Sequence, residues 1–389
     1  MGRSRVGALM VLMLIALFLN GCTGGNAGPS PSPTASSAAI VSLEGTIKRF
    51  MDDGVTSVVA QVRWPGGEWS KAYGVRDGGT NEPARPEDRF SIGSVTKSMT
   101  AAAVMKLVDE GLIGLDDPVN GILESFNTPL KPPGPITVRQ LLSHTSGMPE
   151  FLSVYEQSGT PKELITSGFS MQRGLEMTAT LPWDPRNVGH FAYSNSNYLA
   201  LGQLLEKLRA KAIGDVLRDD IFRPLGLDRS TLSEQDREAQ DNLRTYIEVD
   251  GERVEVTQAE QLIGFPGGGV VSTAEDVNDF FRGLFTGGLI SAPALKEMKT
   301  VESTNYALGL MRWRDTCSSS GYRYGHRGSV TGYLTTAVVS DDGDSQIVIA
   351  MALPTLPMKV GDPVTARKVD HYDSQMELAA NKALDQLCA

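Results

Sequence analysis

Hydrophobic and polar residues follow two different patterns along this chain. Patterns typical of strands occur in residues 56–64, 68–75, 306–313, 324–340 and 346–353. Helical spacing occurs in residues 38–51, 91–110 and 373–387, and helical fragments with long loops fill residues 112–265. Because strands near both ends bracket a helical middle, the pattern predicts a sandwich of helices and strands made from both termini, with an inserted α-helical domain.

The helix expected over residues 91–110 differs from the others because it is apolar nearly all round. Such a helix has no face suited to water, so we expect it to lie buried at the centre of the domain. Gly111 is well placed to end it. Further along, a glycine-rich turn at residues 266–269 precedes Thr273, which is placed to cap another helix.

The first residues have the pattern of an export signal. Arg3 and Arg5 precede an unbroken apolar run over residues 6–19, which is too short for a comfortable membrane-spanning helix. Small Gly21 before Cys22 resembles a bacterial lipobox, in which the cysteine is lipidated. We therefore expect a lipoprotein signal peptide over residues 1–21 and an extracytoplasmic protein anchored to the cell membrane by lipid on Cys22. The alternative is an ordinary secretory peptide with a chance cysteine.

The next segment predicts a flexible stalk over residues 22–38. It consists mainly of Gly, Pro, Ser, Thr and Ala and carries no charge, so it cannot bury enough apolar area to offset the entropy of ordering. The globular domain is then expected over residues 39–389. Its α/β part takes residues 39–92 and 266–389, and its mainly helical part takes residues 93–265.

Three cysteines are present, and two remain if Cys22 is lipidated. An even pair in an oxidising compartment predicts a disulfide between Cys317 and Cys388. Closing that loop would stabilise the fold by about 4 kcal/mol on the chain-entropy model. The alternative is two buried free thiols.

The formal net charge of −10 argues against nucleic-acid binding and against a polybasic membrane-docking face. The four histidines (His144, His190, His326 and His371) lack the spacing of a metal motif, so no metal or cofactor is predicted. Neither a Gly-x-Ser-x-Gly elbow nor a phosphate loop occurs in the sequence. We expect a monomer.

Ser94 and Lys97 lie three residues apart at a helix start, which places their side chains on one face. A serine hydroxyl becomes a good nucleophile when a neighbouring base takes its proton. Lysine can be that base if burial depresses its pKa, and the apolar helix supplies the burial. The alternative is a capping serine beside a solvated lysine.

Tyr193-Ser-Asn195 lies on a polar loop that leads into an apolar helix. A phenol close to ammonium groups can be held partly ionised and move protons. Asn195 offers both a donor and an acceptor, which suits a substrate amide and Lys97 at once. The alternative is that both residues serve only the loop and the helix cap.

Residues 325–329, Gly-His-Arg-Gly-Ser, begin a predicted strand. Gly328 would let a ligand approach the backbone, and the N–H of Ser329 could join that of Ser94 as an oxyanion hole. His326 would lie beside the nucleophile and influence its proton network near neutral pH. Considered alone, a histidine at a strand start is more often structural.

These three motifs, in this order, resemble those of the penicillin-recognising serine hydrolases: class C β-lactamases, serine DD-carboxypeptidases and related esterases. Residues 115–119, residues 141–147 and the glycine-rich turn before Thr273 extend the resemblance over about residues 39–389. It implies an α+β fold of the β-lactamase/transpeptidase type, with an antiparallel sheet flanked by helices, built from both termini, and an inserted all-α domain. A cysteine before the third motif and another at the C-terminus also resemble those of exported DD-carboxypeptidases.

The resemblance implies a role for each motif. Ser94 would form the acyl-enzyme, Lys97 and Tyr193 would move protons, and the backbones of Ser94 and Ser329 would bind the oxyanion. Asn195, His326, Arg327 and Gly328 would contact the substrate. Carboxypeptidases of this branch have a hydroxyl residue directly after the histidine and an arginine on the preceding strand. Here Arg327 or Arg312 would have to bind a terminal carboxylate.

The sequence therefore predicts an extracytoplasmic serine hydrolase that works through an acyl-enzyme on a small molecule or a peptidoglycan peptide. D-alanyl-D-alanine carboxypeptidase or a penicillin-binding relative is the leading hypothesis, and a β-lactamase or a small-ester hydrolase is the alternative. A class A-type deacylating glutamate cannot be placed by motif. The alternative of another class is a non-catalytic protein that binds wall fragments.

Overall fold

The computed structural model describes residues 35–232, 241–257, 265–301, 305–358 and 362–388. The predicted signal peptide and Cys22 lie outside the described residues. Helix α1 (Ala35–Asp52) begins inside the segment predicted to be the stalk. Within the described ranges, no helix is both long and apolar enough to cross a membrane.

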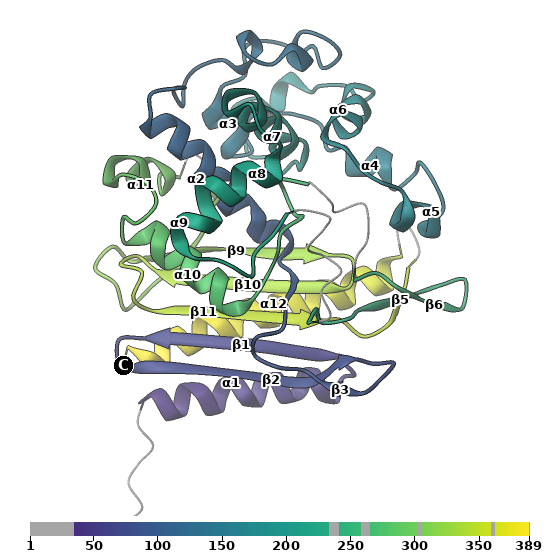
Figure 1. The fold of residues 1–389 in the computed structure, drawn as a ribbon, viewed down its shortest axis with the longest axis vertical. Coiled ribbons are helices and arrows are strands. Elements are labelled where there is room, and N and C mark those ends of the chain that lie inside the picture. The colour runs from purple at the N-terminus through teal and green to yellow at the C-terminus, as the bar shows by residue number, and fades with distance from the viewer. Residues whose placement is uncertain (1–34, 233–240, 258–264, 302–304, 359–361, 389) are drawn as a thin grey trace, which may run out of the picture.

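A seven-stranded antiparallel sheet forms the base of the molecule (Figure 1). Strands from both ends of the chain meet at its centre, where β1 pairs with β11. In spatial order the strands are β3 (Glu82–Pro83), β2 (Gly67–Asp77), β1 (Ser57–Trp64), β11 (Gln346–Ala352), β10 (Tyr333–Ser340), β9 (Tyr322–Val330) and β8 (Met311–Arg314). The predicted sheet from both termini is confirmed.

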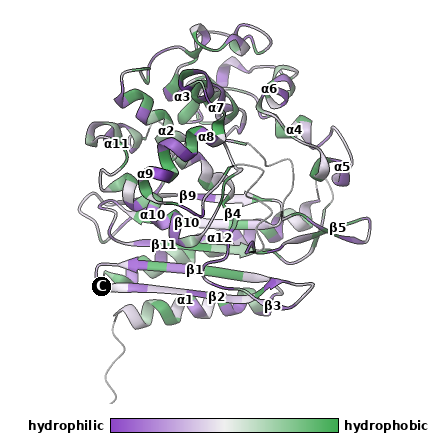
Figure 2. Ribbon diagram, viewed as in Figure 1, coloured by the Kyte–Doolittle hydropathy of each residue, from purple (hydrophilic) through white to green (hydrophobic). Residues whose placement is uncertain are grey.

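The two faces of the sheet bury different helices because strand side chains alternate between faces. On one face, Val58, Ile349 and their neighbours pack with helix α1 and helix α12 (Pro363–Leu387). On the other, Val59 and Ala350 belong to the larger core around α2 (Thr96–Asp109). Hydrophobic stretches, green in Figure 2, line the helices grouped around α2. As expected, α2 is buried and is followed by Gly111 with a positive φ.

The helical part follows α2 and lies over one edge of the sheet (Figure 1). Its helices are α3 (Val138–Leu142), α4 (Leu152–Tyr155), α5 (Pro161–Thr166), α6 (Met171–Ala179), α7 (Ser196–Arg209), α8 (Ile213–Leu217) and α9 (Arg223–Leu225). Short 3-10 and π segments join them: η2 (Val119–Gly121), η3 (Glu124–Phe126), η4 (Pro185–Asn187) and η5 (Arg218–Phe222). Helices α10 (Ala274–Phe285) and α11 (Ala292–Met298) return the chain to the sheet. Thr273 caps α10, as predicted.

Several predicted boundaries are wrong for local reasons. The strand expected over residues 324–340 is a hairpin, because Gly332 adopts a positive φ and the chain turns between β9 and β10. Of the strand expected over residues 306–313, only the last part belongs to β8. The final helix begins at Pro363, capped by Asp362, well before residue 373.

Two small sheets were not predicted. Strand β12 (Leu356–Pro357) pairs with β5 (Tyr246–Val249), which in turn pairs with β6 (Glu252–Glu255). Strand β4 (Phe90–Ser91) pairs with β7 (Val271–Ser272) directly before Ser94. The second pairing fixes the start of the central helix.

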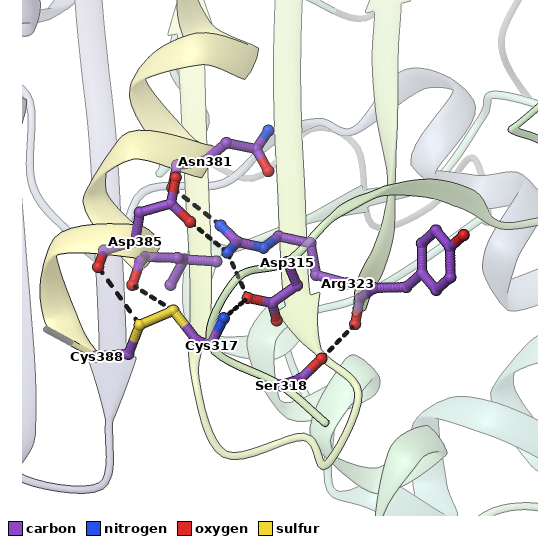
Figure 3. Close-up of a disulfide and its surroundings, with 9 residues drawn as sticks. Asp315, Cys317, Ser318, Arg323, Asn381, Asp385 and Cys388 are labelled. Atoms are coloured by element: carbon purple, nitrogen blue, oxygen red, sulfur yellow. Dashed lines mark hydrogen bonds and ion pairs between the residues drawn. A yellow bond between two sulfur atoms is a disulfide. The ribbon is translucent and has the colours of Figure 1, made fainter. Parts of the chain in front are cut away.

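The C-terminal end of α12 is fastened to the loop before β9 (Figure 3). The predicted disulfide between Cys317 and Cys388 is present, with its Cα atoms 5.9 Å apart. Beside it, buried Arg323 contacts Asp315 and Asp385, at 2.6 Å each. It also donates to the carbonyl of Asn381 at 2.9 Å. The guanidinium is paired with both carboxylates, so the covalent link and the ion pairs hold the same two segments together.

Candidate active site

Ser94 lies where the central helix comes closest to the sheet. It is the middle residue of η1 (Gly93–Val95), which continues directly into α2. A Cβ built on Gly328 of β9 would lie 2.0 Å from the carbonyl oxygen of Ile92 and 3.1 Å from the backbone nitrogen of Ser94. One built on Gly93 would lie 2.9 Å from the nitrogen of Ser329. Glycine at both positions therefore brings the backbone N–H groups of Ser94 and Ser329 together, as an oxyanion hole requires.

Lys97 connects three segments of the chain through its ammonium group. Its Nζ lies 3.1 Å from Ser94 Oγ, 2.7 Å from Asn195 Oδ1 and 2.6 Å from the carbonyl oxygen of Gly267. The side chain is fully buried. Burial lowers the pKa of Lys97 to about 7, although the charge of Glu150 acts in the opposite direction. A large fraction of Lys97 is therefore a neutral amine at neutral pH, able to accept the proton of Ser94.

Tyr193 lies on the other side of the Ser94 hydroxyl. Its ring centroid is 5.0 Å from Lys97 Nζ and 4.1 Å from the ring centroid of His144, on which it stacks. Burial raises the pKa of Tyr193 well above its usual value, while the hydrogen bond with Ser94 lowers it. These opposing effects leave the protonated phenol favoured, and Tyr193, which is 39% exposed as a whole residue, can pass a proton as the sequence analysis expected.

Asn195 is held from two sides. Its Oδ1 accepts from Lys97, and its Nδ2 donates to Glu150 Oε2 at 3.1 Å. The same carboxylate oxygen accepts from the backbone N–H of Asn195 at 2.6 Å. Glu150 was not recognised in the sequence, although it follows the polar segment 143–147 within a few residues.

His326 is buried on β9 and hydrogen-bonded at both ring nitrogens. Its Nε2 lies 3.0 Å from the hydroxyl of Tyr306, and its Nδ1 lies 2.5 Å from the carbonyl oxygen of Arg327. Burial and the nearby charge of Lys97 lower the pKa of His326 to about 3. The ring is therefore neutral near pH 7 and acts on its surroundings only through hydrogen bonds and packing.

Arg327 is not brought to the site by the structure. Its guanidinium lies 2.8 Å from Asp373 and 2.9 Å from Glu377, both on α12. The reason is strand alternation, because neighbouring residues His326 and Arg327 must point to opposite faces of the sheet. The other candidate, Arg312, packs over the ring of Tyr322 at 4.0 Å. Arg327 is therefore not placed as the sequence analysis expected for binding a terminal carboxylate.

An apolar pocket of about 290 Å³ opens beside Ser94, Asn195 and Ser329. Four aromatic rings form its wall, from Phe151, Tyr155, Phe169 and Phe265, with neighbouring ring centroids 5.2–6.1 Å apart. Leu152, Leu164, Val330 and Met358 add aliphatic surface. A site of this kind can take an apolar group attached to the carbonyl that Ser94 would attack.

Sequence reasoning missed three partners of the site: Glu150, the carbonyl of Gly267 and Tyr306. Glu150 and Gly267 lie next to segments that the sequence analysis did single out, the polar turn at 143–147 and the glycine-rich turn at 266–269. Their contacts with Lys97 and Asn195 arise only when α2, α7 and these loops pack together. Tyr306 lay in a segment predicted as a strand and carried no separate signal.

The comparisons with known proteins agree with this architecture. The sequence matches the Beta-lactamase family over residues 43–372. It is 34% identical over 187 residues to "Unguisins hydrolase ungD'" of Aspergillus campestris, covering 44% of this chain and 32% of that protein. It is 32% identical over 216 residues to "Penicillin-binding protein 4" of Amycolatopsis lactamdurans, covering 54% of each. The chain thus spans between a third and about half of the length of these relatives.

Solved structures share the whole fold. A D-stereospecific amidohydrolase from Streptomyces has a TM-score of 0.68 at 27% identity, covering 81% of this chain and 94% of that one. A D-amino acid amidase from Ochrobactrum anthropi SV3 has a TM-score of 0.72 at 22% identity, covering 90% and 98%, and that likeness concerns the fold alone. Together with the match over most of the sequence, the fold and the Ser94 site lead to one assignment. This chain belongs to the β-lactamase family and is a serine hydrolase of the β-lactamase and penicillin-binding-protein type.

Proposed function

We propose that this protein is a serine amidohydrolase that cleaves short peptides or amides of D-amino acids through an acyl-enzyme on Ser94. The observation that carries the proposal is the position of Lys97 Nζ, 3.1 Å from Ser94 Oγ and fully buried. A lysine with a pKa of about 7 is matched to proton transfer at neutral pH.

The reaction follows from these contacts. Neutral Lys97 takes the proton of Ser94 Oγ as the oxygen attacks the substrate carbonyl, and the N–H groups of Ser94 and Ser329 stabilise the oxyanion. The proton then reaches the leaving amine, with the protonated Tyr193 as the shuttle, and the C–N bond breaks. Water attacks the resulting ester, which releases the acid and restores the Ser94 hydroxyl.

The aromatic pocket supports a substrate with a bulky apolar side chain next to the scissile carbonyl. Burying such a side chain would stabilise the complex by about 1.5–3 kcal/mol relative to its exposure to water. A methyl group, as in D-alanine, would leave most of the 290 Å³ unfilled. The likeness to a D-stereospecific amidohydrolase, at 27% identity, supports D-stereochemistry.

Two finer proposals accompany this one. D-alanyl-D-alanine carboxypeptidase activity, the leading hypothesis from the sequence, would need a cation for the terminal carboxylate. Because Arg327 is paired with two carboxylates of α12, we propose that a free carboxylate is not required. We also propose that the protein is extracytoplasmic and anchored to the membrane by lipid on Cys22, which the apolar run before this cysteine supports.

A labelling experiment tests the chemistry. The purified full chain is incubated with a fluorescent penicillin and with an activated ester, alongside Ser94→Ala and a control that removes an exposed serine of α12, Ser374→Ala. We expect covalent label on the wild type and on the control, and none on Ser94→Ala. Failure of both probes to label the wild type or to be turned over by it would refute the acyl-enzyme.

Substrate choice is tested with D-phenylalanine amide, D-alanine amide, L-phenylalanine amide and a D-Ala-D-Ala peptide. We expect the D-phenylalanine amide to have the highest kcat/KM. Its kcat/KM should exceed that of the D-alanine amide by about tenfold or more, because the pocket would bury part of the larger side chain. A D-Ala-D-Ala peptide hydrolysed far faster than its own C-terminal amide would instead favour the carboxypeptidase.

A further inference from the structure

Glu150 occupies a place between the loop after α3 and the start of α7 that the reaction above does not use. Its Oε2 accepts two hydrogen bonds from Asn195, one from the backbone N–H and one from Nδ2, and its Oε1 accepts from the N–H of Leu152 at 3.0 Å. The carboxylate is thus fixed by three donors. Each of them lies on a segment that borders the aromatic pocket or the site.

These contacts decide the orientation of the Asn195 amide. An ionised carboxylate only accepts hydrogen bonds, so the NH₂ end of Asn195 must face Glu150. The oxygen end is then turned to Lys97, which donates to it at 2.7 Å. With one N–H of Nδ2 bound to Glu150, the second remains for the carbonyl of a substrate in the pocket that Asn195 lines.

We propose that Glu150 is a positioning residue, which orients Asn195 toward Lys97 and the substrate and supplies the negative charge that faces the Lys97 ammonium. The inference rests on the proposed function, because it assigns a role in the reaction at Ser94. It concerns the chain Glu150–Asn195–Lys97, whereas the proposed function concerns Ser94 and Lys97 themselves.

The charges around Lys97 make this role measurable. His144 and His326 both lie close enough to sense the charge of Lys97, and burial lowers the pKa of each, so both are neutral near pH 7. The rings of Tyr193 and Tyr198 lie 5.0 and 5.3 Å from Lys97 Nζ, and burial raises the pKa of both phenols. The charge of Arg327, although its guanidinium is paired with α12, lowers the pKa of both Tyr193 and His326. Among the described residues, the charge of Glu150 raises the pKa of Lys97.

The charge of Glu150 should affect the pH dependence of kcat/KM. The reaction needs neutral Lys97, so kcat/KM should rise with pH through the Lys97 pKa, near 7, and then reach a plateau. Removing the negative charge destabilises the ammonium and lowers that pKa. In Glu150→Gln we therefore expect the acidic limb of kcat/KM to move down by about one pH unit, as expected for charges several ångströms apart in a protein site.

Further variants distinguish the effect of Glu150 on the orientation of Asn195 from the effect of its charge on Lys97. In Glu150→Gln the plateau kcat/KM should also fall by about tenfold, because one charge-assisted hydrogen bond to Asn195 is weakened. This loss should be smaller when Glu150→Gln is made in an Asn195→Ala background. The acidic limb of kcat/KM should still move to lower pH in that background, since the charge of Glu150 acts on Lys97 through space. Glu150→Asp keeps the negative charge, so its acidic limb should stay at the pH of the wild type. Glu156→Gln removes an exposed carboxylate nearby and should also leave the limb in place.

The outcomes distinguish the two proposals. A wild type without Ser94-dependent turnover defeats the proposed function. A wild type with a limb near pH 7 that Glu150→Gln leaves unmoved defeats the role of Glu150 only. A uniform loss of rate at every pH, with or without a lower melting temperature, would assign Glu150 to the structure of the loop and overturn the inference.

Discussion

At the scale of single residues, the close approach of β9 to η1 depends on Gly328. An added methyl group would meet the backbone oxygen of Ile92 at 2.0 Å, and a backbone atom cannot rotate away as a flexible side chain can. Gly328→Ala must therefore separate the two oxyanion donors. We expect kcat/KM for an activated ester to fall by about 10²–10³-fold, as when one oxyanion-hole donor is lost.

Gly121→Ala is the matched control for this prediction. A Cβ at Gly121 has nothing within 4 Å, and its φ is not positive, so rate and melting temperature should stay near those of the wild type. Full activity in Gly328→Ala would mean that the reaction does not need the close approach.

Residue-level prediction from the sequence succeeded where the geometry is local. Ser94 and Lys97 are three residues apart on one helix, so their spacing alone predicts contact, and the structure has it at 3.1 Å. Glu150 and Gly267 meet Asn195 and Lys97 across loops distant in sequence, and a spacing rule cannot predict such contacts.

At the scale of elements, strand β9 shows how alternation assigns side chains to faces. Its even positions His326 and Gly328 lie toward the site, while Arg323 and Arg327 both contact α12. The sequence analysis placed Arg327 at the site because the resemblance puts a hydroxyl residue at this position, directly after the histidine, in carboxypeptidases of the same branch. Applying the period of two to the predicted strand would have sent the two side chains to opposite faces.

Arg327 is therefore expected to hold α12 to the sheet rather than to choose substrates. Arg327→Ala leaves Asp373 and Glu377 together without their cation. Because the pairs are partly exposed, we expect a loss of only about 1–2 kcal/mol in the free energy of unfolding. Burial already raises the pKa of Asp373 and Arg327 lowers it, so the variant's carboxyl should ionise at higher pH. Its deficit should be larger at pH 7 than at about pH 4, where the carboxyls begin to protonate.

Denaturant titrations at both pH values measure the loss in the free energy of unfolding that Arg327→Ala causes. The ratio of rates on a peptide acid and its amide should equal that of the wild type. Arg186→Ala, which removes an arginine from an exposed pair with Asp184, provides the control for loss of a surface ion pair. A lost preference for the free acid in Arg327→Ala would restore the role in carboxylate binding that the sequence suggested.

At the scale of the whole molecule, hydrophobic patterning predicted the sheet from both termini because strands buried on both faces, as β1, β10 and β11 are, appear as nearly continuous apolar runs. It did not resolve the turn at Gly332 or the short strands β4, β7 and β12. Two-residue strands have no period to detect, and they form because neighbouring segments bring their backbones together. The order of the strands was not predicted, because a pattern of buried positions does not specify which strands are neighbours.

The disulfide closes the molecule by joining the end of α12 to the loop before β9, across 71 residues. A loop of that length would contribute up to about 4 kcal/mol through the entropy of the unfolded chain. In the variant with both Cys317→Ser and Cys388→Ser, Arg323 should still pair with Asp315 and Asp385, so the two segments should stay in place. We expect a lower melting temperature for the variant, and a reductant should lower the melting temperature of the wild type but not that of the variant.

The same variant should keep its activity. Ser329 lies seven residues along β9 from Tyr322, about 23 Å at the rise of a strand, so kcat/KM at 25 °C should change by less than about twofold. A large loss of activity in a variant that remains folded would mean that the position of α12 also controls the geometry at Ser329, through the strand to which both are attached.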